Sequence, residues 1–142
     1  MAFNGYLIKL GGSTGVELPM KYIKYETYKI TPNQRLDLDT TRDTTGMLHR
    51  NVLSHTAMKV EFETIPMDNY NVAALMTLLR NSFSDNQARK VTLDYYDVET
   101  DSYKTGTFYM PDIQWTIRNV DLRNSDHKVI NYNGARLAFI EY

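Results

Sequence analysis

The chain has 142 residues, which suits one ordinary domain able to bury a core without staples. Lys and Arg number 16 and Asp and Glu 17, so a formal charge of −1 gives no general attraction to nucleic acid or an anionic membrane. The absence of cysteine excludes disulfides, thiolate metal sites and a cysteine nucleophile. Apolar stretches are too short to span a bilayer and the start lacks a signal-peptide pattern, so we expect one globular domain over residues 1–142 and no membrane.

The whole chain is rich in tyrosine, which favours strands. Strand patterns dominate its first half. Residues 6–10, 22–30 and 34–41 are short runs of apolar, aromatic or alternating side chains bounded by turn formers. The clearest alternation is in residues 57–65, where apolar positions face one side. The charged positions of the opposite side are Lys59, Glu61 and Glu63.

One helix is expected in the middle of the chain, over residues 68–83. Pro66 ends the preceding strand, and Asp68 is a suitable N-cap. Apolar residues then recur at the spacing of one helix face: Val72, Leu75, Met76, Leu79 and Phe83.

Strand patterns resume after the helix and continue to the end. Residues 91–96 and 103–109 are expected to form a hairpin around a turn at 99–102, and residues 113–118 a further strand. Residues 128–132 and 135–142 flank Asn133-Gly134, which predicts a second hairpin. The fold class expected is mainly β, with eight or nine strands in two packed antiparallel sheets, as a sandwich or small barrel, around one central α-helix.

Residues 40–56 do not fit a compact sandwich. These 17 residues are polar, locally basic and without a usable period, and yet they contain four apolar side chains. Loops of this length inside compact domains are usually functional or disordered. We therefore expect a long inter-strand arm that orders against a neighbouring subunit.

Catalytic and metal-binding patterns are weak. His49 and His55 are six residues apart and His127 is remote, so none has a metal-ligand spacing. The acids of residues 97–101 alternate as in a calcium loop but lack its glycine and its distal glutamate. Phosphate-binding glycine motifs and nucleophile motifs do not occur. We expect no catalytic residue, no cofactor and no metal.

Two other classes of protein remain open. A carbohydrate-binding β-sandwich would be monomeric and would stack sugars on Tyr22, Tyr25 or Trp115. A small enzyme would use His49 or His55 with Asp43. Neither alternative explains the apolar side chains of the arm.

The order of elements resembles that of small structural proteins of tailed-phage tails and baseplates, the tail-tube-like group that includes the distal tail proteins. The helix at 68–83 and the arm at 40–56 stand at the corresponding places. Residues 42–50 also resemble an Arg-Asp-x-x-Gly-x-Leu-x-Arg pattern of prophage tail-region proteins, and residues 132–142 resemble their ending.

This resemblance implies a virion protein that catalyses nothing and is assembled in the cytoplasm of a bacterial host. Such subunits form rings, commonly of six copies, whose inner strands line a channel for DNA, and they contact neighbouring tail or baseplate proteins. The arm would contact the next subunit through Arg42, Asp43, Met47, Leu48 and Arg50. The channel wall would bear acids that repel passing DNA, and the candidates are Asp37, Asp39, Glu61 and Glu63.

Overall fold

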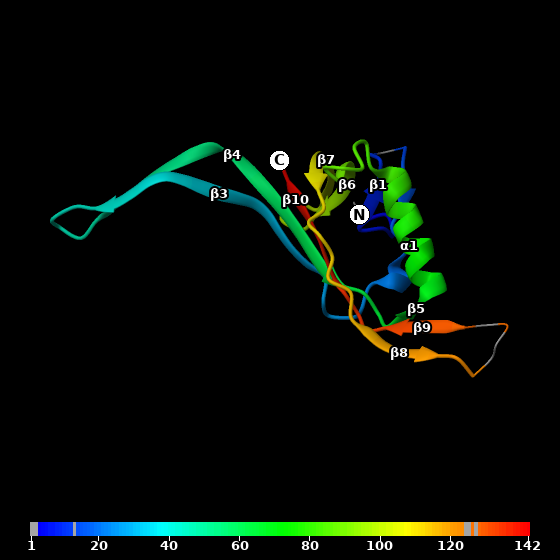
Figure 1. Cartoon of the computed structure of the whole chain (residues 1–142). Helices are drawn as coiled ribbons and strands as arrows, with labels where there is room; N and C mark the ends of the chain where they lie inside the picture. The colour runs from blue at the N-terminus through cyan, green and yellow to red at the C-terminus, as the bar shows by residue number, and fades with distance from the viewer. Residues whose placement is uncertain (1–2, 13, 124–125, 127) are drawn as a thin grey trace.

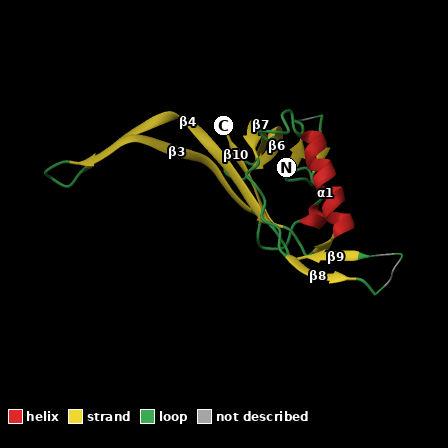
Figure 2. Ribbon diagram, viewed as in Figure 1, coloured by secondary structure: helices red, strands yellow, loops and turns green. Residues whose placement is uncertain are grey.

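The protein is built from two antiparallel sheets and one helix (Figures 1 and 2). The computed structural model describes residues 3–12, 14–123, 126 and 128–142, and it describes only the backbone of residues 33, 35–40 and 49–56. The fold class expected from the sequence is confirmed: the chain is mainly β, with two antiparallel sheets around one helix.

The large sheet has seven strands in the order β2-β1-β6-β7-β10-β4-β3. These strands are β1 (Ile8–Leu10), β2 (Val16–Glu17), β3 (Lys29–Arg42), β4 (Leu48–Glu63), β6 (Lys90–Asp97), β7 (Ser102–Tyr109) and β10 (Arg136–Glu141). The small sheet has the order β5-β9-β8, with β5 (Met67–Asp68), β8 (Ile117–Asp121) and β9 (Val129–Tyr132). Across the described residues, the large sheet does not close into a barrel, because β2 and β3 are its edges.

Helix α1 (Asn69–Ser82) lies where the sequence places it. The Asp68 carboxylate accepts a hydrogen bond from the Asn71 amide at 2.9 Å, which satisfies one free N–H group of the first turn. Leu75 and Leu79 are fully buried and belong to the same core cluster as the apolar face of the large sheet. The helix therefore covers that sheet (Figure 1).

The predicted Asn133-Gly134 hairpin is wrong. Strand β9 pairs with β5 and β8, whereas β10 pairs with β4 and β7, so the dipeptide connects two different sheets. Gly134 is needed for a close approach, since a Cβ there would lie 2.2 Å from the Thr64 carbonyl oxygen. Next to it, the Ala135 amide donates to the Thr64 hydroxyl at 2.9 Å.

Two other strand boundaries differ from expectation. Residues 22–28 are not a strand: a 3₁₀ helix, η1 (Met20–Tyr22), is followed by a loop, and β3 begins only at Lys29. Strand β3 then passes through Pro32, where its pairing with β4 shifts between Thr31 and Gln34. Such an irregularity accommodates a residue that has no N–H group to donate. The strand expected at 113–118 starts at Ile117 instead.

The segment expected to be an aperiodic arm is the outer half of a long hairpin. Strands β3 and β4 stay paired out to Arg42 and Leu48, and the hairpin projects far from the rest of the molecule (Figure 1). Residues 41–48 are all exposed. Because residues 41–48 have no buried face, no alternation of apolar and polar side chains marks them in the sequence.

Candidate functional site

The tip of the arm, residues 42–48, is a turn organised by Asp43. One oxygen of its carboxylate accepts hydrogen bonds from the Thr45 amide at 2.9 Å, the Thr45 hydroxyl at 2.6 Å and the Met47 amide at 3.0 Å. The Arg42 guanidinium donates to the Gly46 carbonyl at 2.9 Å, and Gly46 has a φ of +85°, which favours glycine. The turn is therefore built by its own polar groups.

Four of the five residues predicted for the arm contact thus fall into two groups. Arg42 and Asp43 shape the turn, whereas Met47 and Leu48 hold their apolar side chains in solvent at 64% and 43% exposure. The side chain of Arg50 lies outside the described residues. Within the tip, burial of the Met47 and Leu48 side chains by a partner would stabilise the contact.

The four acids predicted for a channel wall lie in two separate places. Asp37 and Asp39 are on β3 just before the arm, opposite Val52 and Asn51, and their side chains are outside the described residues. Glu61 is on the body, nine residues from Val52, or roughly 30 Å of strand. The structure therefore does not gather the acids into one cluster.

Glu61 is held in an ion pair that the sequence did not indicate. Its carboxylate accepts hydrogen bonds from the Arg136 guanidinium, one of them at 2.9 Å, and the Lys59 ammonium lies 3.8 Å away. The hydrogen bond to Arg136 lowers the pKa of Glu61 below its ordinary value. Glu63, by contrast, is exposed next to this pair.

A second surface lies at the base of the β3–β4 hairpin, around the loop between η1 and β3. We call it the base groove. Its lining is largely apolar: Leu7, Met20, Ile23, Tyr25 and Tyr28, with Lys21, Lys24 and Glu26 beside them. Tyr25 is 93% exposed and Met20 49%. The sequence pattern had assigned these aromatic residues to a strand, so the groove was missed.

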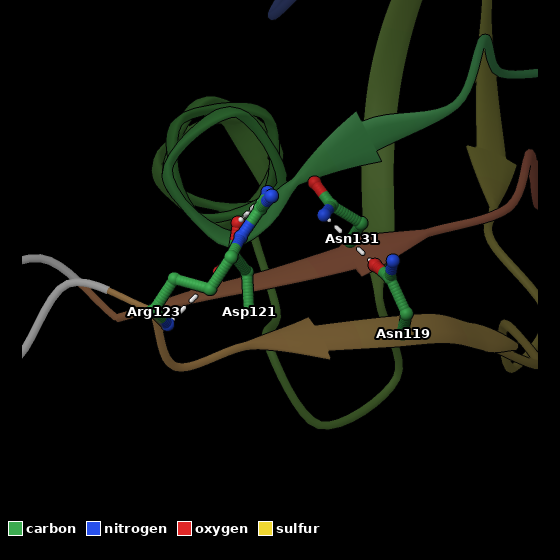
Figure 3. Close-up of polar contacts among 4 residues, drawn as sticks. All are labelled: Asn119, Asp121, Arg123 and Asn131. Atoms are coloured by element: carbon green, nitrogen blue, oxygen red, sulfur yellow. Dashed lines mark hydrogen bonds and ion pairs between the residues drawn. The ribbon is translucent and has the colours of Figure 1, made fainter.

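The small sheet presents a third exposed surface, on its edge strand β8. Ile117 and Val120 are more than half exposed, and so is Leu122 just after the strand. Figure 3 shows the polar contacts that order this edge: the side-chain NH₂ group of Asn131 donates to the side-chain oxygen of Asn119 at 2.8 Å. Beyond the strand, Arg123 binds Asp121 through its Nε and Nη2 atoms and lowers the pKa of that carboxyl to about 2.

The residues of the alternative functions have other roles in the structure. Tyr22 is buried in the core, and Trp115 packs against the core with its ring edge-to-face to Tyr132, which leaves Tyr25 as the exposed member of the proposed sugar platform. The Asp43 carboxylate is engaged in the arm turn. The side chains of His49 and His55, and all of His127, lie outside the described residues.

The acids of residues 97–101 form the turn of the β6–β7 hairpin. Asp97 is fully buried and pairs with the Lys104 ammonium at 2.8 Å. Burial opposes its ionisation, but the contacts with Lys104 and with the Glu99 amide lower its pKa overall. In the described part of the chain, no group of three or more acidic or histidine side chains is placed to hold a metal ion. Nor is any described helix long and apolar enough to cross a membrane.

The fold is similar to that of a chain in a solved structure described as the tail of an empty GTA (gene transfer agent) particle, computed with helical refinement in C6 symmetry. The two chains are 13% identical with a TM-score of 0.51, over 99% of this chain and 95% of that chain. By sequence, the chain belongs to a family described as a family of unknown function (DUF6711), which it matches over residues 1–142. No curated protein matches it significantly. The resemblance to tail proteins is therefore supported at the level of the fold.

Proposed function

We propose that the protein is a structural subunit of a phage-like tail and that it assembles with copies of itself through the arm. The observation on which this rests is the arm itself: a two-stranded ribbon that leaves the core and ends in exposed Met47 and Leu48. An isolated two-stranded ribbon is marginally stable in water. A neighbouring subunit that covers the arm would supply the missing buried face.

The similarity to a chain of a tail particle supports this proposal, since the match extends over almost the whole of both chains. The C6 symmetry in the description of that particle favours a ring of six copies here. The subunit would be part of a tail tube, a distal ring or a baseplate, and it would contact neighbouring tail proteins. It would be found in the virion after assembly in the host cytoplasm.

A ring would also explain the open edges of the large sheet. Unpaired edge strands invite uncontrolled association, and closure with neighbouring subunits removes them. Strands β2 and β3 are the edges concerned. A contact that joins different patches of successive subunits generates such a closed ring when the rotation fits.

The acids predicted for a channel wall keep their role as a proposal. An acidic lumen would repel DNA phosphates and let the duplex slide. Because Arg136 compensates the charge of Glu61, the exposed Glu63 is the stronger candidate of the two on β4. Asp37 and Asp39 complete the set on β3.

The proposal is tested by replacing the exposed apolar side chains of the tip. In native mass spectrometry, we expect the wild-type protein to give discrete oligomers. The double variant Met47→Ser/Leu48→Ser should give mainly monomers, because the side-chain surface buried between subunits would no longer be apolar. Val98→Ser is the matched control, since Val98 is 52% exposed at the β6–β7 turn, far along the chain from the arm.

A second control separates the arm contact from the channel wall. The variant Asp37→Lys/Asp39→Lys should form the same oligomers as wild type, because channel residues face the lumen; loss of the oligomer would remove these acids from the wall. A wild-type protein that stays monomeric up to the highest soluble concentration would refute assembly through the arm.

A further inference from the structure

The base groove and the tip of the arm have matching chemistry. The groove is lined by apolar and aromatic side chains, with Tyr25 almost fully exposed in it. The tip offers two adjacent apolar side chains, Met47 and Leu48. A methionine thioether packs well on aromatic rings, and exposed aromatic residues are frequent anchors of protein interfaces.

The charges near the two surfaces are compatible as well. Lys24 and Glu26 stand beside the groove and are exposed. The tip has Arg42 and Asp43, whereas the groove has the acid Glu26 and two bases, Lys21 and Lys24, so an acid and a base are present on each surface. The tip and the groove can therefore meet without bringing like charges together. Repulsion between like charges is what usually penalises a wrong partner.

Tyr28 belongs to the wall of the groove, and its ring stacks on that of Phe62. The Tyr28 hydroxyl is buried and, among the described residues, has no hydrogen-bond partner. Burial raises the pKa of this hydroxyl above its ordinary value, which keeps it protonated as a donor. Because its hydroxyl is buried inside the subunit, Tyr28 offers its ring and not a hydrogen bond to a partner in the groove.

A chain cannot fill its own groove with its own arm. The groove lies at the start of β3 and the tip at its end, and the 14 residues between Lys29 and Arg42 make roughly 45 Å of paired strand. Figure 1 shows the hairpin directed away from the body. The tip that reaches a groove must belong to another copy.

We propose that the base groove is the receptor for the arm tip of a second copy, with Met47 and Leu48 packed against Tyr25 and Met20. The inference rests on the proposed function, to which it adds the partner surface. Because tip and groove are different patches, each copy donates its tip to one neighbour and receives a tip from another. Such a head-to-tail contact joins many copies with a single kind of interface.

Cysteine cross-linking tests this directly, since the chain has no cysteine of its own. Thr44→Cys places a thiol on the tip and Lys24→Cys places one beside the groove, and both replace exposed side chains without removing an apolar anchor. The two variants, one with a mass tag, are mixed and gently oxidised. We expect a disulfide-linked dimer of the two variants. A chain that carries both Lys24→Cys and Thr44→Cys should form longer covalent chains or closed rings.

Pairing Thr44→Cys with Val98→Cys or Val120→Cys provides the controls, because both valines are exposed elsewhere on the body. If the protein forms oligomers by native mass spectrometry but the tip cross-links to Val120→Cys, or to neither site, the groove is not the receptor and the proposed function stands. If no oligomer forms, both proposals fail.

A variant of the groove itself gives an independent result. Tyr25→Ala should raise the concentration needed for half-assembly at least about tenfold, because it removes the exposed aromatic anchor. Val98→Ala should leave that concentration unchanged. Equal behaviour of the two variants would overturn the inference.

Discussion

Gly134 shows how one residue can fix the connection between two sheets. Its Cα hydrogen faces the Thr64 carbonyl oxygen, and a Cβ in that place would lie 2.2 Å from the oxygen. The surrounding residues cannot easily move, since the Thr64 amide donates to the Ala135 carbonyl at 2.8 Å and both residues are buried.

We expect Gly134→Ala to lower the free energy of unfolding by roughly 1–3 kcal/mol, because the added Cβ must displace the carbonyl of buried Thr64. Urea denaturation measures this. Asn133→Ala is the matched control, because Asn133 is exposed and its backbone hydrogen bond to Thr116 is retained. A loss below about 0.5 kcal/mol for Gly134→Ala would show that the chain can relax around a Cβ.

Tyr6 gives the protein a specific sensitivity to alkaline pH. It is buried and donates a hydrogen bond to Asp94 at 2.9 Å, and burial and this bond raise its pKa to about 12. The folded state thus holds the proton more tightly than the unfolded state, whose tyrosine titrates near 10. The stabilisation is complete below pH 10 and is lost as the pH rises toward 12.

Tyr6→Phe should reduce this alkaline loss of stability and cost roughly 1.5–3 kcal/mol at neutral pH, because Asp94 loses a donor. Urea titrations at several pH values between 8 and 12 measure both effects. Part of the alkaline slope should remain, since burial also raises the pKa of Tyr95 to about 12. An unchanged slope in Tyr6→Phe would contradict this account.

At the scale of elements, the arm combines a well-ordered turn with a weakly supported ribbon. Asp43 organises the turn through Thr45 and Met47, all exposed. None of these hydrogen bonds belongs to the core. The turn therefore determines how the tip is presented to a partner and contributes little to global stability.

Asp43→Ala should consequently abolish hydrogen-exchange protection of the Thr45 and Met47 amides and change the global free energy of unfolding by less than about 0.5 kcal/mol. Thr44→Ala, at the neighbouring exposed position, should leave both amides protected. A large loss of global stability in Asp43→Ala would mean that the arm folds together with the core.

The elements that the sequence predicted are those with one buried side. Strand β4 near Met58 to Phe62 alternates because one side faces the core, and helix α1 has its stripe for the same reason. The arm was missed as a hairpin because residues 41–48 have no buried face. The Asn133-Gly134 dipeptide wrongly predicted a hairpin, because the glycine is required by the close approach to Thr64 and not by a turn.

The candidate surfaces were only partly predictable for a related reason. The apolar side chains of the tip are visible in the sequence, but the roles of Arg42 and Asp43 in the turn follow from hydrogen bonds within a few residues. The pairing of Glu61 with Arg136 joins positions 75 residues apart, which no local pattern indicates. The base groove likewise depends on how the loop after η1 meets Leu7.

At the scale of the whole molecule, the shape separates the surfaces available to partners. The arm tip lies at one extreme, and the β8–β9 hairpin projects on the opposite side of the body (Figure 1). The base groove lies on the body, where the β3–β4 hairpin starts. A molecule with unlike apolar surfaces at distant points is suited to repeated head-to-tail contacts, which is the arrangement proposed for a tail subunit.

The most direct test of this account is electron microscopy of the purified protein in negative stain, beside the Met47→Ser/Leu48→Ser variant. The account predicts rings with a central channel, six-fold in class averages, for the wild-type protein, and small single particles for the variant. Single particles for both proteins, at concentrations up to the limit of solubility, would contradict assembly through the arm.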